Sequence, residues 1–366
     1  MLIVVAMSGG VDSSVAAAVL RREGHEVIGI TMQIWPDEGL ENAERRGGCC
    51  GFGAVRDARA VAELLGIPYY VFQMRDAFER HVIAQFASAY AHGRTPNPCV
   101  ACNEHIKFGA LLDKARRLGA GALATGHYAR RVQGSDGDWR LARATDPRKD
   151  QSYVLHPIRA EDLAFVRFPV GNWSKERTRQ EARALGLGVS DKPDSQEICF
   201  VGAGGYAEIV GMRHPKALDA GPIRDASGRV IGYHRGLAHY TVGQRKGLGL
   251  ESSEPLFVLE IDVEDNAIVV GTAAEVHAAS CDVDQMHWLV PDLPEDGTEV
   301  SVKVRSGPAE HPARVVHRGL GVRLEFLSAV RAVTPGQSAV LYCGDIVLGG
   351  GPIDRVQRSN CASLVG

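Results

Sequence analysis

Closely spaced glycines, serines and an aspartate fill the stretch Ala6–Ser14, which reads Ala-Met-Ser-Gly-Gly-Val-Asp-Ser-Ser. Two adjacent glycines let the backbone approach an oxyanion, and serines add hydroxyl donors. The stretch follows the apolar run Leu2–Val5 and precedes a Val/Ala/Leu run, so it is predicted to join a buried strand to a helix. The N-terminus of that helix favours negative charge. A plain turn with an N-capping serine is the alternative, but the full pattern favours a phosphate-binding loop.

Two other stretches carry cysteines in polar surroundings. Thr95–Asn103 places Cys99 and Cys102 three residues apart, in a proline-rich loop just before a predicted helix. A thiol near a helix N-terminus is partly held as thiolate. Half of a zinc site, a redox pair and a nucleophile with a neighbouring thiol all remain open for this stretch, although no second Cys-x-x-Cys accompanies it. Lys192–Phe200 holds Cys199, which taken alone is equally well explained as a small buried residue.

The composition is that of a globular protein with a sizeable core. The chain has 366 residues, of which 45% are hydrophobic and 23% charged, so two or three domains are expected. No apolar run approaches a membrane span and Met1–Met7 lacks a signal-peptide pattern, so we expect a cytoplasmic protein whose eight cysteines are not a disulfide framework. The net charge of −3 neither supports nor excludes an RNA partner.

The first half alternates buried strands with amphipathic helices, which predicts a doubly wound parallel α/β sheet with ligands at the carboxyl ends of its strands. The loops Ile34–Gly53 and Gly126–Tyr128 should therefore surround the ligand. The predicted strands are Leu2–Ala6, Glu26–Gln33, Tyr69–Met74 and Ala122–Thr125. The predicted helices are Ser14–Glu23, Ala54–Leu65, Asp76–Ala91 and Glu104–Leu118, with Gly24, Gly66 and Gly119 ending three of them, and a later helix capped by Ser174 that ends near Gly186.

Beyond Tyr206 the chain is predicted to be mostly β, because short β-branched runs alternate with Gly, Pro, Asp and Asn. The runs are Gly228–Tyr233, Leu256–Ile261, Ala267–Val270, Glu299–Val304, Ala313–Val316, Gly321–Phe326 and Ser338–Leu341. We divide the chain into a nucleotide-binding catalytic domain (1–205), a small β-rich connector (206–280) and a C-terminal β-barrel (281–366).

The order of motifs along the chain resembles that of the tRNA-specific 2-thiouridylases, which place sulfur on C2 of the wobble uridine in certain tRNAs. The first motif also resembles the pyrophosphatase loop (PP loop) of the ATP-pyrophosphatases, whose nucleotide-binding domain is adenine nucleotide alpha hydrolase-like. The motifs cover almost the whole length: Ser8–Ser13, Asn97–Phe108, Ala124–Tyr128, Lys149–Tyr153, Lys192–Phe200, Gly243–Gly249 and Arg331–Gln337.

The resemblance implies that ATP is a cofactor, with Mg²⁺ as its usual companion. The PP loop would bind the phosphates, and a methionine at the end of the second strand, together with a glycine of the fourth strand's loop, would line the adenine and ribose. Methionine can cover a base and glycine leaves room for one. The residues matching these roles are Ala6, Met7, Ser8, Gly9, Gly10, Val11, Asp12, Ser13, Met32 and Gly126.

The resemblance assigns the nucleophile to Cys102 and the persulfide carrier to Cys199. ATP would convert the C2 carbonyl oxygen to an adenylate, the Cys199 persulfide sulfur would attack C2, and Cys102 would cleave the resulting S–S bond. An alternative order, in which Cys102 first releases sulfide, uses the same residues. A sulfur-donor protein, either a cysteine desulfurase or a relay protein, would supply the persulfide.

One position departs from a common form of the family. Cys99 stands where many members have aspartate, which puts the role of that carboxylate in doubt. Cys99, Cys102 and Cys199 could then hold a [4Fe–4S] cluster with one open iron. The persulfide mechanism is preferred because its two cysteines are sufficient without a metal.

The resemblance also implies tRNA contacts, in which Lys and Arg would position phosphates and Asn or Gln would read a splayed base. The matching residues are Asn97, Pro98, Cys99, His127, Lys149, Asp150, Gln151, Arg305, Ser306 and Gln337. Arg245 and Lys246, in the glycine-rich Gly243–Gly249, suit phosphate contact, although a β-turn looks similar. Cys49 and Cys50 are interpreted as loop thiols.

Two other functions would be compatible with some of these motifs. A ligase or amidotransferase acting on a small metabolite would use the PP loop but would need neither Cys102 with Cys199 nor a barrel. A non-enzymatic RNA-binding or sulfur-carrier protein would bind tRNA without forming AMP or pyrophosphate.

Overall fold

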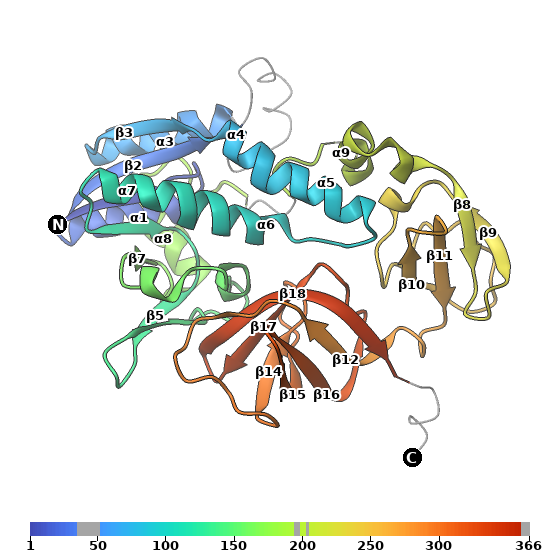
Figure 1. The fold of residues 1–366 in the computed structure, drawn as a ribbon. Coiled ribbons are helices and arrows are strands. Elements are labelled where there is room, and N and C mark those ends of the chain that lie inside the picture. Colours follow the sequence, from blue (N-terminus) through green and yellow to red (C-terminus); the bar gives the residue numbers. More distant parts are fainter. Residues whose placement is uncertain (35–51, 194–197, 203–204, 360–366) are drawn as a thin grey trace. The chain divides into compact units, whose positions relative to one another are not determined.

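The computed structural model describes residues 1–34, 52–193, 198–202 and 205–359 (Figure 1). By its internal contacts the chain forms two compact units. The first contains Met1–Val82, Cys99–Val201 and Asp345–Val347. The second contains Ile83–Pro98 and the other described residues after Val201.

A five-stranded parallel sheet lies at the centre of the first unit, in the order β3-β2-β1-β4-β7. Its strands are β1 (Leu2–Ala6), β2 (Glu26–Gln33), β3 (Tyr69–Gln73), β4 (Ala122–Thr125) and β7 (Val166–Arg167). The four predicted strands are confirmed, except that β3 ends one residue earlier. The two-residue β7 was not predicted, because so short a strand has no period of its own.

Helices pack against this sheet, as the predicted fold class requires. α1 packs against β1, β2 and β4 and also against α3 and α8, while α7 packs against β4. The described α-helices from residue 11 to residue 184 are α1 (Val11–Arg22), α3 (Phe52–Leu65), α4 (Arg75–Phe78), α5 (Ala84–Ala91), α6 (Pro98–Ala101), α7 (Leu112–Arg117) and α8 (Lys175–Ala184), of which α5 belongs to the second unit. Ser174 caps α8 by accepting the Arg177 N–H, as predicted. The predicted glycine stops all have positive φ.

Four predicted helices differ in their bounds or type. α3 begins at Phe52 rather than Ala54. α1 begins at Val11 rather than Ser14, because Gly10 takes the extended N-cap conformation. The helix predicted over Asp76–Ala91 contains the π-helical turn η2 (Glu79–Ile83), and the one predicted over Glu104–Leu118 begins at Pro98 and includes the π-helix η3 (Cys102–Leu111). Side-chain periodicity does not distinguish π from α turns over such short stretches.

The remaining elements of the first unit are a hairpin and two 3₁₀ turns. The hairpin joins β5 (Arg130–Gln133) to β6 (Trp139–Ala142), and Ala142 pairs with Ile346 at the start of β18. The 3₁₀ turns are η4 (Ser152–Leu155) and η5 (Ala160–Asp162).

Part of the second unit is a four-stranded sheet of order β10-β11-β8-β9. Its strands are β8 (Gly221–Arg224), β9 (Val230–His234), β10 (Phe257–Asp262) and β11 (Ala267–Gly271), and the helical segments of this region are α9 (Gly205–Arg213), η6 (Pro215–Leu218) and η7 (Leu237–His239). The β character is confirmed, but β8 and α9 were not predicted.

A closed antiparallel barrel of six strands forms the rest of the second unit, as predicted, since β12 pairs with both β16 and β18 (Figure 1). The strands are β12 (His277–Val283), β14 (Glu299–Lys303), β15 (His311–Arg318), β16 (Gly321–Arg331), β17 (Ser338–Cys343) and β18 (Ile346–Arg358), and the short β13 (His287–Trp288) pairs with β18. Sequence reasoning missed β18 because glycines interrupt it. A Cβ at Gly351 would lie 2.1 Å from the Gln285 carbonyl oxygen, so this strand needs glycine for a close backbone approach.

Candidate active site

The PP loop turns tightly between β1 and α1. Gly9 has φ +65°, and a Cβ there would lie 2.3 Å from the carbonyl oxygen of Ala54, so the loop requires glycine. The Ser13 hydroxyl accepts the Ser8 N–H at 3.1 Å and lies 3.2 Å from the Gly10 carbonyl oxygen. These contacts fold the loop over the start of α1, where the first backbone N–H groups of a helix have no helical partner. The arrangement suits a bound phosphate.

Gly126, at the carboxyl end of β4, lies directly against this loop. A Cβ at Gly126 would be 2.4 Å from the Ser13 nitrogen and 2.6 Å from the Asp12 carbonyl carbon. Both neighbours are backbone atoms, so a side chain could be accommodated only by displacing the first turn of α1. Gly126 therefore sets the position of the PP loop.

We expect Gly126→Ala to weaken ATP binding at least tenfold, because the displaced turn carries the N–H groups that face the phosphates. Isothermal titration with a non-hydrolysable ATP analogue measures the change. Gly188→Ala is the matched control, since a Cβ at Gly188 meets open space and its φ is not positive. Equal affinities for the two variants would contradict this role.

A buried lysine holds the aspartate of the loop. The Lys175 ammonium on α8 donates to both carboxylate oxygens of Asp12, at 2.7 and 2.8 Å, and the Tyr128 hydroxyl donates to one of them at 2.8 Å. The Lys175 side chain is 8% exposed and that of Asp12 30% exposed. These two donors fix the orientation of the carboxylate, while its exposed part remains able to meet a ligand.

A second lysine reaches the loop from the stretch that carries Cys199. Lys192 donates to the Gly9 carbonyl oxygen at 3.0 Å and to an oxygen of Asp57 on α3 at 2.7 Å. Positive charge therefore comes to the PP loop from two lysines that both lie far from it in the sequence. Of the predicted adenine-side residues, Met32 is buried near the end of β2.

The two cysteines of Thr95–Asn103 lie in the first helical turns, not before them. Cys99 is exposed in α6, and Cys102 is half-buried as the first residue of η3. The next residue, Asn103, is buried and donates to the Val154 carbonyl oxygen at 2.8 Å. This bond fastens the start of η3 to η4, so Cys102 has a well-defined position.

Cys199 is half-buried, and its neighbour Phe200 links it to the same region. The Phe200 ring packs edge-on against Phe78 of α4, at 5.8 Å between centroids, and α4 packs against η3. The residue after Cys199 and the π-helix that begins at Cys102 therefore both contact α4. Of the stretch predicted to carry Cys199, residues 194–197 lie outside the described residues, as do Cys49 and Cys50.

A [4Fe–4S] cluster would need Cys99, Cys102 and Cys199 to lie together as its ligands. Among the described residues, which include Cys99, Cys102 and Cys199, no three His, Cys, Asp or Glu side chains are grouped as metal ligands. The arrangement does not fit a cluster held by these three thiols. Burial in the barrel raises the pKa of the Cys281 thiol to about 12, which makes this cysteine a poor nucleophile.

His127 lies beside Gly126 and is held as neutral imidazole. Its Nδ1 is 2.8 Å from the Thr125 hydroxyl and its Nε2 is 3.3 Å from the Lys107 ammonium of η3. Burial, and secondly the Lys107 charge, lower the pKa of His127 well below 6.5. His127 thus connects the loop after β4 to the helix that begins at Cys102.

This pKa shift predicts a pH-dependent stability. Above pH 6.5 both folded and unfolded chains hold a neutral His127, whereas below it only the unfolded chain gains a proton, so stability falls as the pH falls. The slope is at most about 1.4 kcal/mol per pH unit. We expect the difference in free energy of unfolding between wild type and His127→Gln to shrink by about 1 kcal/mol from pH 7.0 to 5.5 in urea titrations. A constant difference would contradict a neutral His127.

The residues predicted to contact tRNA fall into several places. His127 and Gln151 are adjacent, since the Tyr128 N–H donates to the Gln151 side chain at 2.9 Å. The Asp150 carboxylate accepts the backbone N–H groups of Ala144 and Ser152, both at 3.1 Å, and so shapes the turn around Lys149. In the second unit, Arg305 and Ser306 are exposed in the loop after β14. The half-buried Gln337 donates to the Thr95 carbonyl oxygen at 2.8 Å.

Three family models match the chain in succession. They are the tRNA methyl transferase HUP domain over residues 1–203, the tRNA methyl transferase PRC-barrel domain over residues 211–272 and the Aminomethyltransferase beta-barrel domain over residues 278–353. The tRNA-specific 2-thiouridylase MnmA of Chloroflexus aurantiacus is 49% identical over 354 residues, which cover 96% of this chain and 98% of that one. The protein of the same name from Acetivibrio thermocellus is 46% identical with the same coverage.

The chain belongs to the tRNA-specific 2-thiouridylase family.

The relative from Methylorubrum extorquens, also named tRNA-specific 2-thiouridylase MnmA, is 47% identical over 362 residues, covering 97% of this chain and 94% of that one. Among solved structures, a 4-thiouridine synthetase in complex with RNA and ATP aligns over 54% of this chain and 44% of that chain, with 18% identity and a TM-score of 0.34. That likeness is too distant to bear on function.

The roles of four residues at the site of this 2-thiouridylase family member were missed by sequence reasoning. Lys175 and Tyr128 hold Asp12, and Asp57 pairs with Lys192. Tyr128 and Lys192 stood inside quoted motifs, but no role was assigned to them. Lys175 directly follows the N-cap of a helix distant in sequence, and only the fold brings it to the PP loop.

Proposed function

We propose that this protein thiolates C2 of the wobble uridine, position 34, of tRNA, using ATP and releasing AMP and pyrophosphate. The main observation behind this proposal is the PP loop, whose Asp12 is fixed by Lys175. This loop lies in the same compact unit as Cys102 and Cys199. The full-length relatives named for 2-thiouridylation support it. The domain models are named for methyl transfer, but a PP loop and two accessible thiols are suited to adenylation followed by sulfur transfer.

The first step is adenylation. Residues Ala6–Ser13 bind the phosphates, and Met32 and Gly126 line the adenine and ribose. The uridine C2 oxygen attacks the α-phosphorus, the bond to the β-phosphate oxygen breaks and pyrophosphate leaves. The exposed edge of Asp12 is the place for Mg²⁺, which would neutralise charge on the phosphates.

The second step is sulfur transfer. The terminal sulfur of a Cys199 persulfide attacks C2, the C2–O bond breaks and AMP leaves with the former C2 oxygen. The Cys102 thiolate then attacks the Cys199 sulfur, which frees 2-thiouridine and leaves a Cys102–Cys199 disulfide. An external thiol resets the disulfide, and a cysteine desulfurase or relay protein reloads Cys199. Release of sulfide by Cys102 before attack on C2 is the alternative order.

We also propose which residues contact the tRNA. We assign Asn97, Pro98 and Cys99 to the target base, and the other contacts to His127, Lys149, Asp150, Gln151, Arg305, Ser306 and Gln337. The exposed Arg305 suits a phosphate, and the Asn97 amide suits the edge of an unstacked base.

We further propose three functional domains: residues 1–205 for catalysis, 206–280 as a connector and 281–366 as the barrel. The successive domain-model matches support this division.

Within the residues that the structure describes, no helix has the length and apolar character needed to cross a membrane. We propose that the reaction takes place in the cytoplasm, where tRNA is found.

Nucleoside mass spectrometry of tRNA from cells that lack this gene tests the function. We expect 2-thiouridine to be absent and to return when the wild-type gene is supplied. Unchanged 2-thiouridine in the deletion strain would contradict the proposal.

A further inference from the structure

The beginning of the stretch Thr95–Asn103 is hydrogen-bonded to the barrel. The Thr95 N–H donates to the Pro335 carbonyl oxygen at 2.9 Å, and the Gln337 side chain donates to the Thr95 carbonyl oxygen at 2.8 Å. Both polar backbone groups of Thr95 are thus held by the turn between β16 and β17. All of these residues belong to the second unit.

The turn itself is shaped to receive this segment. Gly336 has φ +92°, and a Cβ there would lie 2.8 Å from the Thr95 nitrogen and 3.0 Å from the Arg94 Cβ. The turn is tied to β18, because the Gly336 N–H donates to the Ile353 carbonyl oxygen at 2.9 Å and the Ile353 N–H donates to the Gln337 carbonyl oxygen at 2.8 Å. Its close fit to Thr95 therefore rests on the barrel wall.

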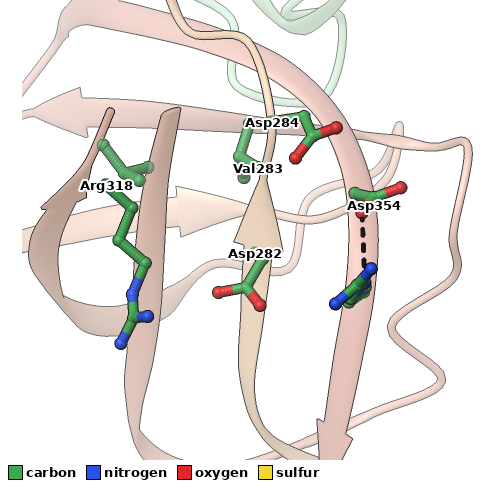
Figure 2. A pocket seen from close by; sticks show the side chains of 7 residues that line it. Asp282, Val283, Asp284, Arg318 and Asp354 are labelled. Atoms are coloured by element: carbon green, nitrogen blue, oxygen red, sulfur yellow. Dashed lines mark ion pairs between the residues drawn. The ribbon is translucent and has the colours of Figure 1, made fainter. Parts of the chain in front are cut away.

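The next residue of β18 adds an ion pair. The Asp354 carboxylate pairs with Arg94, and its other oxygen lies 3.6 Å from the Arg355 guanidinium. Asp354 also lines a pocket of about 300 Å³ with Asp282, Asp284 and Arg318 (Figure 2). With only 18% of its side chain exposed, Asp354 is little screened by solvent.

We propose that the barrel acts as a clasp that positions the stretch leading to Cys102, with Arg94, Gln337 and Asp354 as positioning residues. The chain runs from Thr95 through Asn97 and Pro98 into α6 and η3, so a fixed Thr95 limits where the first helical turns begin. The Thr95 hydroxyl is buried and has no hydrogen-bond partner in the described part of the chain, which shows that packing holds the segment there despite that cost. This inference rests on the proposed sulfur transfer.

Gln337→Glu tests the clasp, because it keeps the size of the side chain but places an acceptor opposite the Thr95 carbonyl oxygen. We expect the single-turnover rate of 2-thiouridine formation to fall about tenfold. Pyrophosphate release at saturating tRNA should change less than twofold. Hydrogen exchange of the backbone around Thr95 should become faster. Gln285→Glu, at an exposed position after β12, is the matched control.

The ion pair gives an independent test. Arg94→Gln and Asp354→Asn should each slow sulfur transfer, and the double variant should be no slower than the slower single variant. A raised tRNA Kd at unchanged sulfur-transfer rate would overturn the clasp and leave Gln337 with its proposed tRNA contact alone. Full activity of all variants, or unchanged hydrogen exchange at Thr95, would also overturn it. If wild-type protein itself forms no 2-thiouridine, the proposed function fails instead.

Discussion

Cys102→Ser protein is expected to form no free 2-thiouridine and to accumulate a covalent complex with tRNA. If the Cys199 persulfide attacks C2, the base is joined to Cys199 through an S–S bond until a second thiol cleaves it. Serine cannot perform that exchange. We expect at least a 1,000-fold loss of product, together with a slowly migrating protein–tRNA species on denaturing gels that dithiothreitol removes.

Cys199→Ser should lose product to the same degree but form no covalent complex, because it cannot carry the persulfide. Cys343→Ser is the matched control, since this exposed thiol ends strand β17 of the barrel, and it should retain wild-type activity. Loss of product without any complex in Cys102→Ser would support prior release of sulfide. Full activity of either serine variant would contradict the two-cysteine mechanism.

Asp12→Asn is the second change with a large expected effect. The Asp12 carboxylate accepts hydrogen bonds from Lys175 and Tyr128. In the proposed reaction its exposed edge would meet the nucleotide. An amide has no negative charge, and only its oxygen can accept a hydrogen bond. The amide nitrogen would therefore face the Lys175 and Tyr128 donors without accepting from them. We expect pyrophosphate release to fall at least 100-fold, while the tRNA Kd changes less than twofold.

Lys175→Met should reduce pyrophosphate release in the same direction, because Asp12 then loses the cation that fixes it. Asp138→Asn, in the exposed turn of the β5–β6 hairpin, is the control for removing one carboxylate. A pyrophosphate assay and filter binding with labelled tRNA give the two readouts. Wild-type pyrophosphate release by Asp12→Asn would mean that this loop does not bind the reacting nucleotide.

The sequence was sufficient for the elements whose pattern is local. Strands β1, β2 and β4 have the predicted bounds, because each is a short apolar run ended by a turn signal. Ser174 and the glycine stops were found because capping depends on a few neighbouring residues. Strand β18 was missed because its glycines serve distant backbone contacts with Gln285 and His287, which no local pattern contains.

The same distinction applies to the site. The PP loop and the two cysteine stretches could be named from the sequence because their own residue types suit the chemistry. The partners of these residues could not, since Lys175 lies 163 residues from Asp12 and Gln337 lies 242 residues from Thr95. A lysine after a helix cap and a glutamine in a turn are ordinary surface residues until the fold brings them to their partners.

The fate of the C2 oxygen tests the central claim most directly. Transfer RNA with ¹⁸O at C2 of the target uridine, incubated with the protein, ATP and a persulfide donor, can be followed by mass spectrometry of AMP and of the nucleosides. If the C2 oxygen is adenylated and replaced by sulfur, each 2-thiouridine formed should be matched by one AMP that carries ¹⁸O. Unlabelled AMP, or 2-thiouridine formed without AMP, would contradict the account.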